Sequence, residues 1–246
     1  MSDSLVIIPT YNEKENIEAI IAAVFELSKP FDILVVDDGS PDGTGNIVLN
    51  IKKELKEGHQ LHLIERSGKL GLGTAYIEGF KFAIQHDYKY VFEMDADFSH
   101  NPADLLKLYE ACAIEGNDMA IGSRYVKGVN VVNWPMGRVL MSYFASIYVR
   151  VITGMNIKDT TAGFVCLSQK VLKTIDLDSI KFIGYAFQIE MKFTAFKYGF
   201  KITEVPIIFT DRTKGQSKMS KGIFKEAVIG VIQMKIRSWF NKYISA

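Results

Sequence analysis

The first half of the chain alternates short apolar runs with longer stretches in which apolar residues recur every three or four positions. The short runs, rich in valine, isoleucine and leucine, predict β-strands, and the longer stretches predict amphipathic helices. Strands that alternate with helices through short links favour an α/β fold, a mainly parallel sheet with helices on both faces. The expected strands are Leu5–Ile8, Ile33–Val36, Leu61–Ile64, Tyr90–Met94 and Met119–Ile121, and the expected helices between them are Glu15–Leu27, Gly43–Leu55, Thr74–Gln85 and Pro102–Ala113.

The second half contains fewer strand-like runs. Its pattern predicts helices over Gly137–Thr153 and Ala186–Tyr198 and a strand over Lys201–Phe209. Asp211–Ser220, rich in lysine, glycine and serine, is expected to be a mobile loop. A last amphipathic helix is expected over Lys221–Tyr243. We therefore predict one α/β catalytic domain over residues 1–210, followed by a loop and an amphipathic helix over residues 211–246.

Charge is unevenly distributed along the 246 residues, although the formal net charge is only +1. From Lys197 onward 10 Lys and Arg stand against 3 Asp and Glu, a local charge of +7, whereas the preceding residues carry 19 against 25, or −6. A basic, partly apolar C-terminal region predicts contact with an anionic surface or ligand. The balanced total gives no nucleic-acid signature.

Cysteine usage and apolar run length bear on location. Cys112 and Cys166 lie in apolar contexts without metal-ligand spacing, which favours reduced core residues in the cytoplasm. The first residues lack the pattern of a signal peptide, and no apolar run is long enough to span a bilayer. The sequence thus predicts a cytoplasmic protein that can touch a membrane without crossing it.

Acidic side chains follow two of the predicted strands. Asp37 and Asp38 come directly after the second strand, and Asp95 and Asp97 follow the fourth. Ligands of open parallel sheets bind beyond the carboxyl ends of the strands, and carboxylates at i and i+2 of an extended chain project to the same side. Such acids can also cap helices or line turns. The pairing of two strand-end clusters favours a site for Mg²⁺ or Mn²⁺.

The first strand ends in a segment that suits a nucleoside. Tyr11 can stack on a base, and Glu13 together with Asp38 can accept hydrogen bonds from a base or a ribose. The glycine-rich fingerprints of dinucleotide and triphosphate folds do not follow this strand. A turn aromatic and a first-turn helix acid explain Tyr11 and Glu13 equally well, so both interpretations stay open on these residues alone.

The last predicted helix carries an apolar stripe with basic residues between its members. Packing against the domain or a partner explains such a stripe, and so does a helix lying on anionic lipid. The stripe consists of Phe224, Val228, Ile232, Ile236 and Phe240, and the basic residues are Lys221, Lys225, Lys235, Arg237 and Lys242.

Taken together, these segments resemble the GT-A glycosyltransferases of family 2, and among them the polyprenyl (dolichol) phosphate mannose synthases. The resemblance covers nearly the whole chain and keeps the order of the family's motifs. Two positions depart from it: Ser99 stands where some relatives carry a glutamine metal ligand, and Val165 where many place a basic residue. The motifs are Ile8–Glu13, Val35–Thr44, Lys69–Tyr76, Met94–His100, Gly122–Tyr125, Gly184–Glu190, Asp211–Arg212 and Gly215–Met219.

The resemblance implies a role for each matching site residue. It places the donor nucleoside on Pro9, Tyr11, Glu13 and Asp38, and the metal of the donor diphosphate on Asp95, Asp97 and Ser99. The acceptor phosphate would lie on Arg124, Arg138 and Ser142, and Arg212 and Lys218 would close over the diphosphate. Arginine suits phosphate because its planar fork bonds two oxygens at once.

The implied activity is an inverting, metal-dependent transfer of a sugar, mannose from GDP-mannose by resemblance, to a polyprenyl or dolichyl phosphate at the cytoplasmic face of a membrane. UDP-glucose or another donor, or a hydroxyl acceptor on a glycan, is the alternative within the family. A nucleotidyltransferase would need a glycine-rich loop after the first strand, which this sequence lacks. The intact Asp95 and Asp97 pair argues against a non-catalytic sugar-nucleotide sensor.

Overall fold

The computed structural model describes residues 2–55, 58–212, 221–240 and 243, without the side chains of residues 185 and 221–227. Seven strands form one sheet in the order β3-β2-β1-β4-β7-β5-β8. All neighbouring pairs in it are parallel except those of β7, which runs antiparallel to both β4 and β5. These strands are β1 (Ser4–Thr10), β2 (Asp32–Asp37), β3 (Leu61–Glu65), β4 (Tyr90–Glu93), β5 (Met119–Ser123), β7 (Val165–Ser168) and β8 (Ile202–Pro206).

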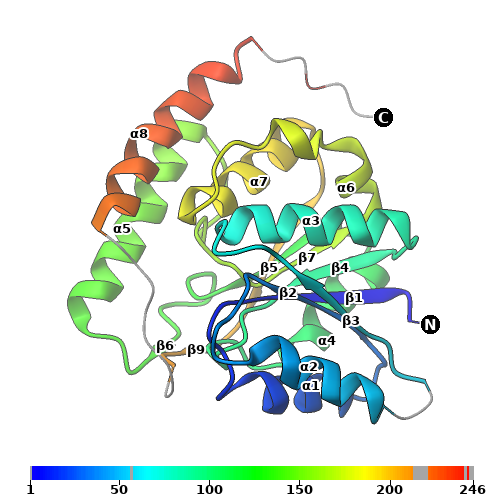
Figure 1. Ribbon diagram of the computed structural model, residues 1–246. Helices are drawn as coiled ribbons and strands as arrows, with labels where there is room; N and C mark the ends of the chain where they lie inside the picture. The colour runs from blue at the N-terminus through cyan, green and yellow to red at the C-terminus, as the bar shows by residue number, and fades with distance from the viewer. Residues whose placement is uncertain (1, 56–57, 213–220, 241–242, 244–246) are drawn as a thin grey trace.

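Helices cover both faces of the sheet, as the sequence predicts (Figure 1). Alternate residues of β1 face opposite cores, because successive side chains of a strand point to opposite sides. Leu5 and Ile7 pack with α3, α6 and α7, whereas Val6 and Ile8 pack with α1, α2 and α4. The bounds are α1 (Ile17–Phe25), α2 (Thr44–Lys53), α3 (Leu72–Gln85), α4 (Asp104–Tyr109), α6 (Gln169–Thr174) and α7 (Tyr185–Lys197), with a π-helical turn η1 (Glu110–Ile114) and a 3₁₀ turn η2 (Leu177–Ser179).

Two further helices, α5 (Met136–Thr153) and α8 (Lys221–Arg237), lie side by side at one end of the molecule (Figure 1). Tyr148 Oη donates a hydrogen bond to the Val228 carbonyl at 2.8 Å, and Lys235 Nζ donates one to the Thr153 carbonyl at 3.2 Å. A Cβ on Gly230 would lie 2.6 Å from the Phe182 ring. The glycine therefore allows α8 to pack closely against Phe182, in the segment that precedes α7. The helix that the sequence predicts to reach Tyr243 ends at Arg237.

The largest differences from the predicted elements lie in the second half. The strand expected over Lys201–Phe209 is divided into β8 and β9 (Phe209–Thr210), and β9 pairs with β6 (Val131–Val132) in a separate two-stranded sheet. β7 was not predicted at all, because a four-residue apolar run carries little periodicity. Val165, where the resemblance predicts a basic residue, is buried within β7. Cys112 and Cys166 are buried free thiols, as expected of core cysteines.

Candidate active site

The strand-end segments meet at one edge of the sheet. β1, β2 and β4 are mutually parallel, and β5 runs in the same direction because β7 is antiparallel to both β4 and β5. The carboxyl ends of these four strands therefore lie at one edge of the sheet. They place there Pro9–Glu13, Asp37–Asp38, Asp95–Asp97 and Arg124. The sequence predicted this convergence for the acidic segments.

The two acids after β2 have different surroundings. Asp37 Oδ1 accepts hydrogen bonds from the hydroxyls of Thr10, at 2.7 Å, and Ser40, at 2.6 Å, and the Ser40 N–H donates to its other oxygen. Asp37 thus shapes the turn. Asp38 is buried, and its Oδ2 accepts a hydrogen bond from the Leu70 N–H at 3.2 Å. Arg66 Nε lies 3.2 Å from Asp38 Oδ1, a contact that the sequence did not suggest.

The segment after β1 forms a tight entry into α1. Asn12 adopts a left-handed conformation with φ of 56°, and Glu13 donates its N–H to Thr44 Oγ1 at 3.0 Å. Asn16 Nδ2 donates to Glu13 Oε2 at 3.0 Å, so this buried carboxylate also closes the start of the helix. Lys69 Nζ lies 5.2 Å from the centroid of the half-buried Tyr11 ring. Both sequence interpretations, helix entry and nucleoside contact, are compatible with these positions.

Carboxylates crowd around Asp95. Burial and the charge of Asp97, with smaller contributions from Glu13 and Glu93, together raise the pKa of Asp95 to about 7 against the opposing charge of Arg212. Arg212 Nη2 contacts Asp97 Oδ2 at 2.8 Å. So many like charges in one place suit a divalent cation. Within the described ranges, no three His, Cys, Asp or Glu side chains are grouped to hold a metal on their own.

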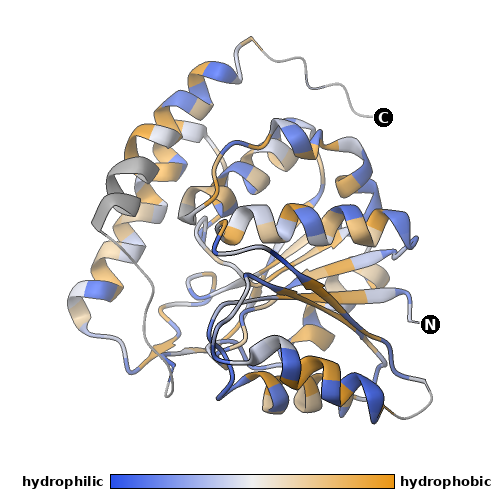
Figure 2. Ribbon diagram, in the orientation of Figure 1, coloured by the Kyte–Doolittle hydropathy of each residue, from blue (hydrophilic) through white to orange (hydrophobic). Residues whose placement is uncertain are grey.

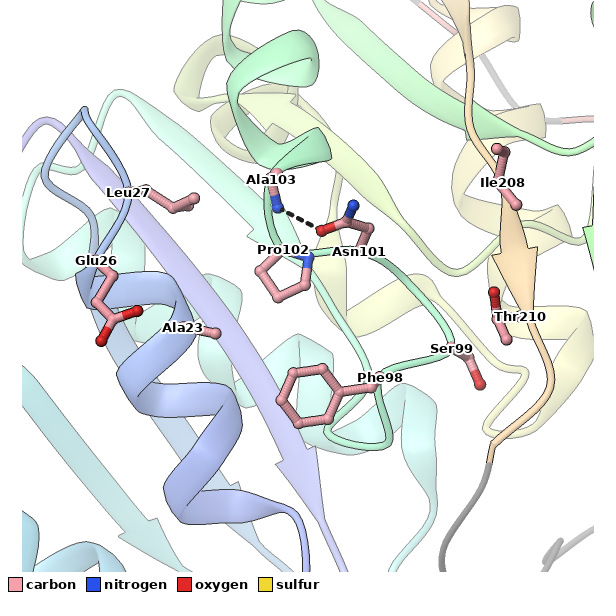
Figure 3. A pocket seen from close by; sticks show the side chains of 10 residues that line it. All are labelled: Ala23, Glu26, Leu27, Phe98, Ser99, Asn101, Pro102, Ala103, Ile208 and Thr210. Atoms are coloured by element: carbon pink, nitrogen blue, oxygen red, sulfur yellow. Dashed lines mark hydrogen bonds between the residues drawn. The ribbon is translucent and has the colours of Figure 1, made fainter.

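The third expected metal ligand, Ser99, contacts Asp97 through its backbone. The Ser99 N–H donates to Asp97 Oδ1 at 3.0 Å, and the Ser99 carbonyl accepts a hydrogen bond from the Thr210 N–H. The Ser99 side chain lines a groove between the end of α1, the loop after Asp97 and β9 (Figure 3). Phe98, which lines the same groove, adopts a left-handed backbone conformation with φ of 58°.

Arg124 and Arg138, the arginines expected at the acceptor side, both lie beside the indole of Trp134. The guanidinium of Arg124 lies 5.4 Å, and that of Arg138 4.1 Å, from the Trp134 ring centroid. Arg124 forms a buried fork with Asp159, with Nε to Oδ2 at 2.7 Å and Nη2 to Oδ1 at 2.6 Å. Ser142 lies close to the buried hydroxyl of Tyr125, the residue after Arg124. Trp134 was not singled out from the sequence, because nothing local connects it with either arginine.

Two consecutive residues connect the acidic site with this arginine cluster. Arg138 Nη1 donates to both oxygens of Asp211, at 2.9 and 3.0 Å, while the next residue, Arg212, contacts Asp97. The two residues that follow β9 therefore contact both the acidic site at Asp97 and the arginine cluster at Arg138. Lys218, the other residue expected on this loop, lies outside the described residues.

A buried polar chain supports the strand beneath the acids. Gln188 Nε2 donates to Glu93 Oε2, and Lys192 Nζ donates to Gln188 Oε1 at 3.1 Å and to the Ala162 carbonyl at 2.6 Å. Burial raises the pKa of Glu93 to about 7 and lowers that of Lys192 to about 8. This chain ties α7 to β4 and to the loop that carries Asp159. The sequence pattern gave no sign of it.

The sequence of this chain matches one protein family and individual relatives. The model of the family described as "Glycosyl transferase family 2" matches residues 5–176. A polyprenol monophosphomannose synthase of Mycolicibacterium smegmatis is 44% identical over 97% of this chain and 89% of its own length. An undecaprenyl-phosphate mannosyltransferase of Micrococcus luteus is 44% identical over 92% of this chain and 91% of its own.

Among solved structures, glucosyl-3-phosphoglycerate synthase from Mycobacterium tuberculosis in complex with Mn²⁺, UDP-glucose and phosphoglyceric acid has a similar fold. It aligns with a TM-score of 0.67 and 15% identity over 97% of this chain and 80% of its own. At that identity the similarity concerns the fold alone.

Proposed function

This chain belongs to glycosyl transferase family 2, and we propose that it transfers a sugar from a nucleotide-sugar donor to a polyprenyl phosphate, with mannose from GDP-mannose as the specific reaction. The predicted GT-A fold and glycosyltransferase activity are confirmed by the family match and the relatives. One observation carries the proposal: Asp211 and Arg212 join the Asp97 site to the Arg138 cluster. The acidic site that would hold the metal of the donor diphosphate then lies next to the cationic site that would hold the acceptor phosphate.

On the donor side, Pro9, Tyr11, Glu13 and Asp38 would hold the nucleoside. Asp95 and Asp97 fit Mg²⁺ or Mn²⁺, with Ser99 supplying a backbone contact to Asp97, a hydroxyl or a bound water. The metal, when bound, supplies positive charge to the diphosphate. Arg212 is close enough to Asp97 to reach the same diphosphate, and Lys218 would join it from the loop.

On the acceptor side, Arg124, Arg138 and Ser142 would hold the phosphate monoester. This group is anionic near neutral pH, so no side chain has to remove a proton from it. A phosphate oxygen forms a bond to the anomeric carbon while the bond from that carbon to the diphosphate breaks, and the electron pair leaves with the diphosphate. The contribution of the protein is orientation and stabilisation of charge.

A direct test compares donors and acceptors. Radiolabelled GDP-mannose and UDP-glucose are each incubated with a short polyprenyl phosphate and Mg²⁺, and the product is extracted into organic solvent. We expect label in the organic phase with GDP-mannose. Label from UDP-glucose alone would correct the donor, and faster transfer to a glycan hydroxyl than to the phosphate would replace the proposed reaction with glycan extension.

An exposed apolar face on α5 and α8 supports a peripheral position at an anionic, cytoplasmic membrane surface. Val231 and Met234 of α8 are buried, whereas Ile232 and Ile236 of the predicted stripe are exposed. Hydrophobic positions occur along both helices (Figure 2). Arg150, Lys235 and Arg237 are half-buried basic residues of the same helices; Lys235 donates to the Thr153 carbonyl, and Arg237 pairs with Glu190. Within the described parts of the chain, no helix is long and apolar enough to cross a bilayer. The exposed apolar residues are Met136, Leu140, Met141, Tyr143, Phe144 and Val151 on α5, and Ile229, Ile232, Ile236, Trp239 and Phe240 on or just after α8.

Replacing Ile232, Ile236 and Phe240 together by serine should weaken binding to liposomes containing phosphatidylglycerol. These side chains contribute apolar area to a bilayer but little to the folded domain, so stability should change little. Added salt should weaken binding of the wild type, because the basic residues are screened. Flotation measures both effects. The matched control is Ile114→Ser, an exposed apolar side chain on η1; equal flotation of both variants and the wild type would remove the membrane proposal.

A further inference from the structure

Arg66 is a buried arginine at the end of β3 that connects three elements of the donor side. Only 8% of the residue is exposed. Its Nε lies 3.2 Å from Asp38 Oδ1, after β2, and 3.7 Å from Glu78 Oε2, on α3. Its Nη2 donates a hydrogen bond to Thr74 Oγ1, also on α3, at 2.6 Å. The guanidinium is therefore fixed from both sides.

The backbone around Arg66 is equally constrained. The Arg66 N–H donates to the Asp37 carbonyl at 2.8 Å. Gly39 has φ of 65°, and a Cβ at this position would lie 2.9 Å from the Arg66 carbonyl oxygen, so the loops after β2 and β3 touch where only glycine fits. Lys69, on the same loop as Arg66, reaches over the Tyr11 ring. Arg66 thus lies directly behind the surface expected to contact the nucleoside.

The charge of Arg66 favours the ionised form of Asp38. Burial raises the pKa of Asp38, the Arg66 guanidinium is the largest influence that lowers it, and the charge of Asp37 raises it. Asp38 Oδ1, Arg66 Nε and Arg66 Nη1 are among the buried atoms of the described residues that have no hydrogen-bond partner, so the 3.2 Å contact between Nε and Oδ1 is ionic and leaves Oδ1 able to accept a hydrogen bond. A carboxylate can accept N–H or O–H groups at both oxygens only while it is ionised.

We propose that Arg66 is a positioning residue for the donor nucleoside: it fixes the ionised Asp38 carboxylate so that this group accepts a hydrogen bond from the base or ribose of a nucleoside diphosphate. The inference rests on the proposed donor site and adds to it a residue that does not itself touch the donor. Glu78 is the other carboxylate facing Arg66 and is half exposed, so it competes weakly for the guanidinium.

The test is calorimetric binding of GDP and of UDP, each with MgCl₂, to the wild type, Arg66→Met and Arg66→Lys. Near neutral pH we expect Arg66→Met to bind about tenfold more weakly, because the carboxylate that accepts the hydrogen bond of the nucleoside loses its fixed position and its favourable charge. The deficit should shrink as pH rises, because Asp38 then ionises without help. Comparing variant with wild type at each pH cancels titration of the nucleotide itself. Arg66→Lys, which keeps the charge, should recover most of the affinity.

A double-mutant cycle separates positioning from general support. In an Asp38→Asn background, Arg66→Met should change affinity by less than about twofold, because the group it acts on has no charge to fix. Arg237→Met, which breaks an ion pair with Glu190 on α7, serves as a control for the loss of an arginine elsewhere and should bind nucleotide normally. Thermal midpoints verify folding.

Two results would overturn the inference: a deficit that does not vary with pH, or the same loss in the Asp38→Asn background. Arg66 would then act only as a support of the loop. If the folded wild type binds neither GDP nor UDP, the donor class proposed above is wrong and the inference falls with it, so the two failures are distinguishable.

Discussion

Asp97→Asn should reduce sugar transfer by at least about a thousandfold while the protein stays folded. The substitution keeps the size of the side chain and an oxygen that can accept the Ser99 N–H, but it removes one of the two charges that would hold a divalent cation. It also removes the ionic partner of Arg212. Initial rates with saturating Mg²⁺ or Mn²⁺ measure the loss, and the wild type should lose its activity in excess EDTA.

The stability of the same variant separates a functional carboxylate from a structural one. Because the charge of Asp97 raises the pKa of its neighbour Asp95, removing it relieves repulsion and offsets the loss of the Arg212 contact, and the thermal midpoint in buffer without metal should stay close to that of the wild type. Asp104→Asn is a matched control, since Asp104 is a buried acid seven residues further on that pairs with Lys107. Full activity of the wild type in EDTA would contradict the metal proposal.

Arg138→Ala should lower the rate about a hundredfold at limiting polyprenyl phosphate, with nucleotide binding close to that of the wild type. Arg138 is partly exposed beside Trp134, and its loss would remove a charged hydrogen-bond donor from the acceptor phosphate. Arg212→Ala should behave in the opposite way, weakening nucleotide diphosphate binding or slowing its departure. The measurements are initial rates over a range of acceptor concentrations and calorimetric binding of GDP with Mg²⁺.

Asp211→Asn distinguishes phosphate binding from loop support. If Arg138 acted only through its ion pair with Asp211, this variant would lose as much activity as Arg138→Ala. We expect a smaller loss, because the arginine remains available to the acceptor. An unchanged acceptor dependence in Arg138→Ala would remove the phosphate-acceptor proposal and favour a hydroxyl acceptor.

The sequence by itself determined the sheet of the first half and the position of its acids. The alternation of apolar strands with amphipathic helices is a local signal, and parallel strands joined by helices have their carboxyl ends at one edge. The positions of Asp38, Asp95 and Asp97 at that edge followed from these two facts. The motifs also identified the family, whose model matches residues 5–176.

Tertiary structure decided which side chains meet within that edge. Arg66 against Asp38, Arg212 against Asp97, and Trp134 between Arg124 and Arg138 join residues that are distant in sequence, and no periodicity relates them. Tertiary structure also decided the antiparallel strand β7, because its four residues are stabilised by pairing with β4 and β5 and have no recognisable strand pattern of their own. The outward orientation of the α8 stripe was also open, because a helix with apolar residues around much of its circumference can pack by either face. The close contact at Gly230 and the hydrogen bond from Tyr148 to the Val228 carbonyl favour the observed one.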